Sequence, residues 1–186
     1  EIEYVVKDCG AKAIIASPEK VDAIIGVKNV SDVKEIISFG HDVANGAVSF
    51  DALIEANILP PKPVEIDPAA LSTIGYTSGT TGHPKGAMQS HRAVITNGAM
   101  TSQIQMRGAD DCVVSALPCP HVYANVIMMS MMMFGSKLVL HRTFDVDLAF
   151  ADITAHKATI FDGVPAMYMF MLNSPAIKNA NLSSLT

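Results

Sequence analysis

The chain has few cysteines and few basic side chains, and each shortage argues against a class of protein. Three cysteines among 186 residues are odd in number and too few for a secreted disulfide framework, so we expect reduced thiols in a cytoplasmic protein. Lysine and arginine number 13 against 18 aspartates and glutamates, which gives a formal net charge of −5. This balance argues against a nucleic-acid partner bound on a basic face.

A hydrophobic run long enough to cross a membrane is also missing. Residues 112–136 contain no Asp, Glu, Lys or Arg, but Pro118 and Pro120 interrupt them. About 16 residues follow the second proline, fewer than the ~20 that a spanning helix requires. We therefore expect a chain that does not span a membrane. We interpret the five methionines between Met128 and Met133 as core filling or, alternatively, as the lining of an apolar channel.

The chain does have enough apolar residues for a folded core. Hydrophobic residues make up 49% of it and charged residues 17%, which is typical of globular proteins and not of disordered ones. The sequence begins inside an expected helix and ends at NLSSLT without a closing element. We therefore expect residues 1–186 to be part of a larger domain. The sequence leaves the oligomeric state open.

Segments with strand and helix character alternate along the chain. Short apolar runs bounded by Gly, Pro or polar residues predict strands at 12–16, 34–39, 71–77, 111–117, 138–141 and 158–161. Helices are expected at 1–8, 18–27, 50–57, 91–106, 121–134, 147–156 and 165–172. The proline-rich segment 58–68 is interpreted as a linker. This alternation predicts an α/β fold with a mainly parallel sheet.

The strongest chemical signal is the segment 76–88, YTSGTTGHPKGAM. Its hydroxyl groups and backbone N–H groups can donate to an anion, its glycines let the backbone approach a ligand, and its lysine adds a mobile positive charge. Together these features suit a polyphosphate. The candidate phosphate-binding residues are Thr77, Ser78, Gly79, Thr80, Thr81, Gly82 and Lys85.

This segment is not the common P-loop. That motif places Gly and Lys side by side before a Ser or Thr. Here His83 and Pro84 separate Gly82 from Lys85, and Gly86 follows the lysine. A flexible linker is the simpler alternative, but a linker needs neither a lysine held after a proline nor apolar segments on both sides. We therefore favour a phosphate-binding loop.

The sequence YTSGTTGHPKG resembles the signature loop of the adenylate-forming superfamily, which contains acyl-CoA synthetases, peptide-synthetase adenylation domains and luciferases. The opening segment EIEYVVKDCGAKAIIAS resembles the upstream part of that family, and LPCPHVYANV resembles its second motif. FDVDLAFADITAHKATIFDGVPAMY resembles the helix, strand and proline that follow in acyl-CoA ligases. The likeness covers nearly the whole chain, and overall it favours a fatty-acyl-CoA ligase.

The resemblance implies a role for each of the two motifs. The loop residues named above would hold the β- and γ-phosphates of ATP, with Lys85 stabilising charge and Thr77 helping to bind Mg²⁺. His121 matches the motif histidine that lies near the acyl carboxylate. Val122 and Tyr123 would then line the acyl site or pack behind it.

The second motif departs from the family pattern at two positions. Pro120 stands where family members often place an aromatic residue, and Ala124 stands where glycine is common. The aromatic gate of some members is therefore not expected here in the same form.

The resemblance also implies a two-step reaction. A carboxylate oxygen attacks the α-phosphorus of ATP and pyrophosphate leaves, after which the thiol of coenzyme A attacks the acyl-adenylate and AMP leaves. The family's acidic magnesium motif, its ribose-binding Asp and its C-terminal lid domain with a catalytic lysine are not found before Thr186. We therefore expect residues 1–186 to be a partial N-terminal, AMP-binding domain that does not complete adenylation by itself.

Three alternatives accompany this interpretation. Cys112, Cys119 and His121 offer three unevenly spaced zinc ligands, which is poor evidence for a zinc site. The chain could also be a nucleotide-binding module without turnover, or a structural fragment that binds no ligand. Titration with magnesium and ATP would separate the last two.

Overall fold

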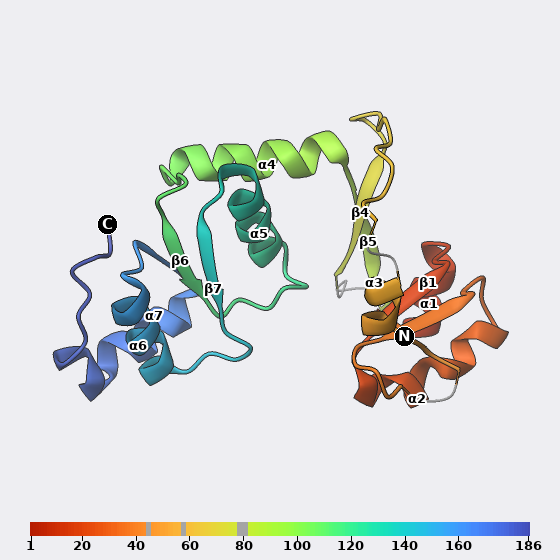
Figure 1. The fold of residues 1–186 in the computed structure, drawn as a ribbon, viewed down its shortest axis with the longest axis horizontal. Helices are drawn as coiled ribbons and strands as arrows, with labels where there is room; N and C mark the ends of the chain where they lie inside the picture. The colour runs from red at the N-terminus through yellow and green to blue at the C-terminus, as the bar shows by residue number, and fades with distance from the viewer. Residues whose placement is uncertain (44–45, 57–58, 78–81) are drawn as a thin grey trace. The chain divides into compact units, whose positions relative to one another are not determined.

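The computed structural model describes residues 1–43, 46–56, 59–77 and 82–186. They form two compact units, residues 1–89 and residues 90–186 (Figure 1). The predicted α/β fold is confirmed, because helices alternate with strands and both three-stranded sheets are parallel. Within the described part of the chain, none of the helices combines the length and hydrophobicity that a membrane span needs.

The first unit contains a small parallel sheet and a second sheet of two strands. The parallel sheet has the order β1-β2-β3, and β4 pairs with β5. Its elements are α1 (Ile2–Asp8), β1 (Ala13–Ala16), η1 (Pro18–Lys20), α2 (Val21–Ile24), η2 (Ile25–Asn29), β2 (Glu35–Ser38), β3 (Val48–Ser49), α3 (Phe50–Ala56), β4 (Leu71–Thr77) and β5 (Lys85–Ser90). The core of the first unit consists of Val6, Val21, Ile24, Val27, Val33 and Ile36.

Three elements of the first unit differ from the prediction, namely the helix expected over 18–27 and the strands β3 and β5, which were not predicted. The helix expected over 18–27 is a single α-helical turn between two 3₁₀ segments, η1 and η2. The strand β5 was not predicted, because its sequence KGAMQS lacks the β-branched and aromatic residues that favour strands. Pairing with β4 stabilises the extended conformation that the intrinsic propensity of this segment does not favour. Gly86 permits this pairing, since a Cβ there would lie 2.7 Å from Ile74 Cγ2.

The second unit is a three-stranded parallel sheet with the strand order β7-β6-β8. Its elements are α4 (His91–Ile104), β6 (Cys112–Ser115), α5 (Val122–Phe134), β7 (Lys137–Leu140), α6 (Val146–His156), β8 (Ile160–Asp162), α7 (Pro165–Asn173) and η3 (Pro175–Lys178). These agree with the elements expected from the sequence, except that most strands are shorter and that η3 was not predicted. Helix α4 also ends two residues earlier than predicted.

The central strand β6 is buried along its whole length, with helices covering both faces of the sheet. Cys112 and Val114 belong to one cluster with Ile153 of α6. Val113, which points to the opposite face, belongs to a second cluster with Ile127 of α5. This alternation is the two-residue period of a strand, and it explains why β6 reads as a continuous apolar run.

Side chains cap the starts of three helices, and two of these starts, at His91 and Phe50, lie where the sequence predicts them. The Ser90 hydroxyl accepts a hydrogen bond from the Ala93 N–H at 3.2 Å, and the Asp145 carboxylate accepts one from the Leu148 N–H at 2.8 Å. Ser49 caps α3 in the same way, through the Ala52 N–H at 3.0 Å. Each cap satisfies a backbone donor that the first helical turn leaves free.

The methionine run of α5 is less buried than predicted. None of its five methionines is buried, and the buried residues of the helix are Ala124, Val126, Ile127 and Ser130. Helix α5 packs against α4 where both carry small residues. There the Ser102 hydroxyl donates to the Ser130 hydroxyl at 2.6 Å, and Gly98 lies beside Met129 and Met133.

Helix α4 ends in a Schellman motif built on a residue other than glycine. Met106 adopts φ of 51°, in the left-handed region. The Arg107 N–H donates to the Ser102 carbonyl at 2.8 Å, and the Met106 N–H donates to the Gln103 carbonyl at 3.2 Å. These are the two hydrogen bonds of the motif, which usually places glycine at the left-handed position.

We predict that Met106→Gly raises the free energy of unfolding by about 1 kcal/mol, because glycine removes the steric cost of a left-handed residue. The Met106 side chain is 88% exposed, so little packing is lost. Urea unfolding measures the change. Met106→Ala is the matched control, since it keeps the Cβ and should leave stability nearly unchanged. A glycine variant less stable than the alanine variant would contradict the prediction.

Candidate functional site

The predicted phosphate loop connects β4 to β5 in the first unit. Thr77 is the last residue of β4 and Lys85 is the first residue of β5, and both are exposed. The predicted phosphate-binding residues Ser78, Gly79, Thr80 and Thr81 lie outside the described residues. The structure therefore describes the two ends of the loop and its exit through Gly82, His83 and Pro84.

The glycine at the loop exit is required by its backbone conformation. Gly82 has φ of 114°, which side-chain-bearing residues rarely adopt. A Cβ built there would meet nothing within 4 Å among the described atoms, so crowding is not the reason. Glycine at this position therefore serves the backbone conformation, whereas phosphate binding by it stays a prediction.

The loop exit is held against helix α1 by an aromatic contact. The rings of His83 and Tyr4 stack with centroids 4.9 Å apart and an angle of 21° between their planes. A hollow of about 390 Å³ is lined there by Glu1, Tyr4, Gly82, His83 and Pro84. The His83 ring thus has a structural partner as well as a position beside the loop.

A second contact ties the strand before the loop to the same helix. The Tyr76 hydroxyl on β4 donates a hydrogen bond to the Asp8 carboxylate on α1. This hydrogen bond is the main cause that raises the pKa of Tyr76 far above its usual value, so the phenol stays protonated. The two contacts place both ends of the loop beside α1.

Lys85 is available to an anion. Its side chain forms neither an ion pair nor a hydrogen bond with any residue that the structure describes. An exposed ammonium group at the exit of a loop rich in N–H and O–H donors suits a phosphate group. Thr77 offers a single hydroxyl oxygen, and such an oxygen suits Mg²⁺, which keeps several waters and binds phosphate oxygens. Both roles stay predictions.

The second motif lies at the carboxyl edge of the sheet in the second unit. Strands β6 and β8 are neighbours and end at Ser115 and Asp162, so the loops that follow them begin side by side. The chain continues from β6 to α5 and from β8 to α7. Ligands of open parallel sheets bind outside the carboxyl ends of the strands, where successive connections diverge.

His121 is the N-cap of α5, a role that the sequence did not predict. Its Nδ1 atom accepts a hydrogen bond from the Tyr123 N–H at 3.2 Å. The His121 side chain is exposed, and Val122 beside it is 53% exposed. Both side chains are thus accessible at the edge where a ligand would bind, and the predicted contact with an acyl group stays a prediction.

Tyr123 takes part in a buried polar network that sequence reasoning missed. Its hydroxyl donates to Asp162 Oδ1 at 2.9 Å, and Arg107 Nη2 donates to Asp162 Oδ2 at 2.5 Å. The Ser115 hydroxyl donates to the Asp162 carbonyl at 2.9 Å. A charged residue at the end of the otherwise apolar strand β8 is the one signal in the sequence that could have indicated this network.

The Arg107–Asp162 pair is almost fully removed from solvent. The exposed fractions of the two side chains are 1% and 4%. Arg107 Nε and Nη1 find no hydrogen-bond partner among the described residues. Burial, followed by the charge of Asp162, raises the pKa of Tyr123, so the phenol remains a neutral donor at physiological pH.

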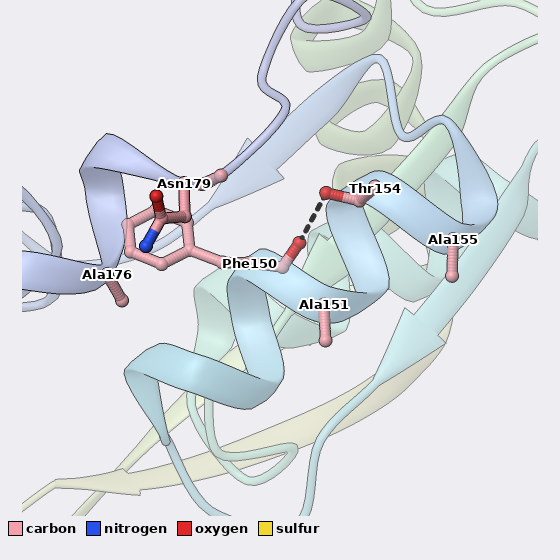
Figure 2. Close-up of a pocket in the computed structure, with 7 residues that line it drawn as sticks. Phe150, Ala151, Thr154, Ala155, Ala176 and Asn179 are labelled. Atoms are coloured by element: carbon pink, nitrogen blue, oxygen red, sulfur yellow. Dashed lines mark hydrogen bonds between the residues drawn. The ribbon is translucent and has the colours of Figure 1, made fainter.

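A separate open pocket lies between α6 and η3. Figure 2 shows the residues that line it, with the Thr154 hydroxyl donating to the Phe150 carbonyl at 2.9 Å. Its volume is about 330 Å³, and its lining consists of Phe150, four alanines, Thr154 and Asn179. No charged side chain lines it among the described residues, so it is a poor candidate for binding ATP or a carboxylate.

The cysteine and histidine set proposed as an alternative zinc site gains no support. Across the described ranges, the structure holds no group of three His, Cys, Asp or Glu side chains that could bind a metal ion. Cys112 lies in the core of the second unit, while Cys119 is exposed.

The whole chain, residues 1–186, matches the family model described as AMP-binding enzyme. Indoleacetate–CoA ligase of Aromatoleum aromaticum is 30% identical, over 100% of this chain and 36% of that protein. 4-Coumarate–CoA ligase 1 of Solanum tuberosum is 31% identical, over 77% of this chain and 27% of that protein. The chain spans about a third of the length of the curated relatives it matches.

The fold is shared with solved structures of CoA ligases. A long-chain-fatty-acid–CoA ligase of Archaeoglobus fulgidus superposes with a TM-score of 0.83. The superposition covers 100% of this chain and 37% of that protein, at 21% identity. At this identity the likeness shows the fold alone.

The two cysteines beside the second motif should differ sharply in reactivity. Burial raises the pKa of the Cys112 thiol, so less of the reactive thiolate forms at neutral pH, and the side chain is also shielded. We predict that iodoacetamide modifies Cys119 in the folded protein and Cys112 only after unfolding. Timed labelling with peptide mass spectrometry checks this, with Cys119→Ser as the control. Equal rates at the two sites would contradict it.

Proposed function

The chain belongs to the AMP-binding enzyme family, and we propose that it is part of an ATP-dependent acid–thiol ligase. The protein activates a carboxylic acid as its acyl-adenylate and transfers the acyl group to coenzyme A. The observation that carries this proposal is the exposed Lys85, which has no partner among the described residues and follows Gly82 at the exit of a hydroxyl-rich loop, in a chain that matches this family throughout.

In the first step, a carboxylate oxygen forms a bond to the α-phosphorus of ATP. The bond from that phosphorus to the bridging oxygen breaks, and pyrophosphate leaves with the electron pair. The loop N–H and O–H groups and Lys85 stabilise the charge on the departing group. Mg²⁺, with Thr77 among its ligands, would add positive charge at the same phosphates.

In the second step, the thiol sulfur of coenzyme A attacks the acyl carbonyl carbon and AMP leaves. Residues of the second motif serve the acyl group in this proposal, with His121 near the carboxylate and with Val122 and Tyr123 along the acyl chain. Their place at the carboxyl edge of the sheet supports this assignment. We further propose that residues 1–186 are part of the N-terminal domain of a cytoplasmic enzyme whose lid domain lies elsewhere.

The class of acid is a finer proposal. The resemblance of the sequence favours a fatty acid. The relatives named above are ligases of indoleacetate and 4-coumarate, which favours an aromatic acid as the second candidate. The incomplete burial of the α5 methionines leaves apolar side chains that either class could contact.

We predict that Lys85→Ala lowers acid-dependent exchange of labelled pyrophosphate into ATP by a factor of about 100 or more, because charge on the departing pyrophosphate loses its compensation. The assay uses the full-length protein with fatty and aromatic acids of graded size. Lys62→Ala is the matched control, since it removes one exposed lysine from the proline-rich segment 58–68 and should leave the exchange unchanged.

The outcomes separate the two functions. Exchange that requires an acid and falls in Lys85→Ala supports the ligase and ranks the acids. ATP binding without exchange for any acid would instead support a nucleotide-binding module without turnover.

A further inference from the structure

We infer that Arg107 and Asp162 are positioning residues that orient the Tyr123 phenol as a hydrogen-bond acceptor in the acyl site. The protein thereby favours acids whose acyl group carries a hydrogen-bond donor. This inference rests on the proposed ligase function and names a property of its substrate.

The first argument is the burial of the charged pair. The side chains of Arg107 and Asp162 are only 1% and 4% exposed, and two nitrogens of Arg107 have no partner among the described residues. Desolvating two charges costs about as much as their attraction returns, so an apolar pair of similar volume would stabilise the unit at least as well. Stability therefore does not explain why this pair is present.

The second argument is geometric. Asp162 is held on three sides, by Arg107 on Oδ2, by Tyr123 on Oδ1 and by Ser115 on its carbonyl. Arg107 directly follows the left-handed Met106, and its N–H completes the Schellman motif of α4. Each member of the network is thus positioned by an ordered element, and the Tyr123 hydroxyl has one defined direction.

The third argument concerns what Tyr123 can still offer a ligand. Its O–H proton is directed at Asp162, so the phenol oxygen can only accept further hydrogen bonds. Burial and Asp162 raise the pKa of Tyr123, and a hydrogen bond from the Gln105 side chain lowers it against these larger causes, so this amide donates to the phenol oxygen. Gln105 is exposed, so water can satisfy its amide when a ligand hydroxyl or N–H takes its place.

The Tyr123 oxygen distinguishes acids that can donate a hydrogen bond to it from acids that can only accept one. An acid with a ring hydroxyl or N–H can donate to the Tyr123 oxygen. An acid that offers only an acceptor, such as a methyl ether, places two acceptors face to face. A site built around one hydrogen bond rejects the mismatched analogue because a buried polar group is left unpaired.

Asp162→Asn tests the inference with an isosteric change. Arginine has only donors, so Arg107 should take the amide oxygen of the new side chain, and the amide NH₂ should face Tyr123. The Tyr123 O–H must then turn toward the ligand and donate. We expect the ratio of kcat/KM for the hydroxy acid to kcat/KM for the methoxy acid to fall about tenfold or more. The methoxy acid should then become the preferred substrate.

The measurement is the ratio of kcat/KM values in the full-length protein. The acids are the para-hydroxy and para-methoxy forms of phenylpropenoic acid and, for the fatty class, a terminally hydroxylated fatty acid and its methyl ether. Tyr123→Phe should abolish the preference, because the phenol oxygen that accepts the hydrogen bond is gone. Tyr168→Phe is the matched control, because its hydroxyl donates to the Phe161 carbonyl at 2.7 Å and not to Asp162.

An unchanged ratio in Asp162→Asn or Tyr123→Phe overturns the inference, as does an equal loss with both acids. If Asp162→Asn does not fold, the paired replacement Arg107→Met with Asp162→Leu buries no unpaired charge, and the preference should be lost there too. A preference retained in that variant also overturns the inference. Absence of pyrophosphate exchange with every acid in the unsubstituted protein would instead refute the proposed function.

Discussion

The complete burial of strand β6 is the constraint on which the second unit depends. A parallel strand with apolar residues on both faces must have a helix on each side, and β6 has α5 on one face and α6 on the other. Strands β7 and β8 then flank it, and the loops after β6 and β8 start at one edge. Tyr123 and Asp162 meet at that edge because of this topology.

The first unit positions its loop by a different means. The sheet β4-β5 is mostly exposed and gains little from burial. Two polar contacts with α1 hold it instead, the Tyr76–Asp8 hydrogen bond and the stacking of His83 on Tyr4. Lys85 then begins a strand rather than a flexible segment. Its charge is thus carried on an ordered backbone, as electrostatic stabilisation of a phosphate group requires.

The two motifs, one in each unit, use charge in opposite ways. Lys85 stays exposed and without a partner among the described residues, so its charge is available to a ligand. Arg107 and Asp162 neutralise each other in the interior, so their effect on a ligand passes through the neutral phenol of Tyr123. The first arrangement suits an anion of high charge, and the second suits recognition of a neutral group by hydrogen-bond direction.

Local signals in the sequence determined the α/β class, the helix starts at His91 and Phe50, and the phosphate-loop motif, because each depends on residues close together in the chain. The tertiary structure alone decided the strand β5, the partial exposure of the α5 methionines and the network of Arg107, Tyr123 and Asp162. Arg107 and Asp162 are 55 positions apart, so no local pattern predicts their contact. Such contacts form only when the strands pair and the helices pack in the folded chain.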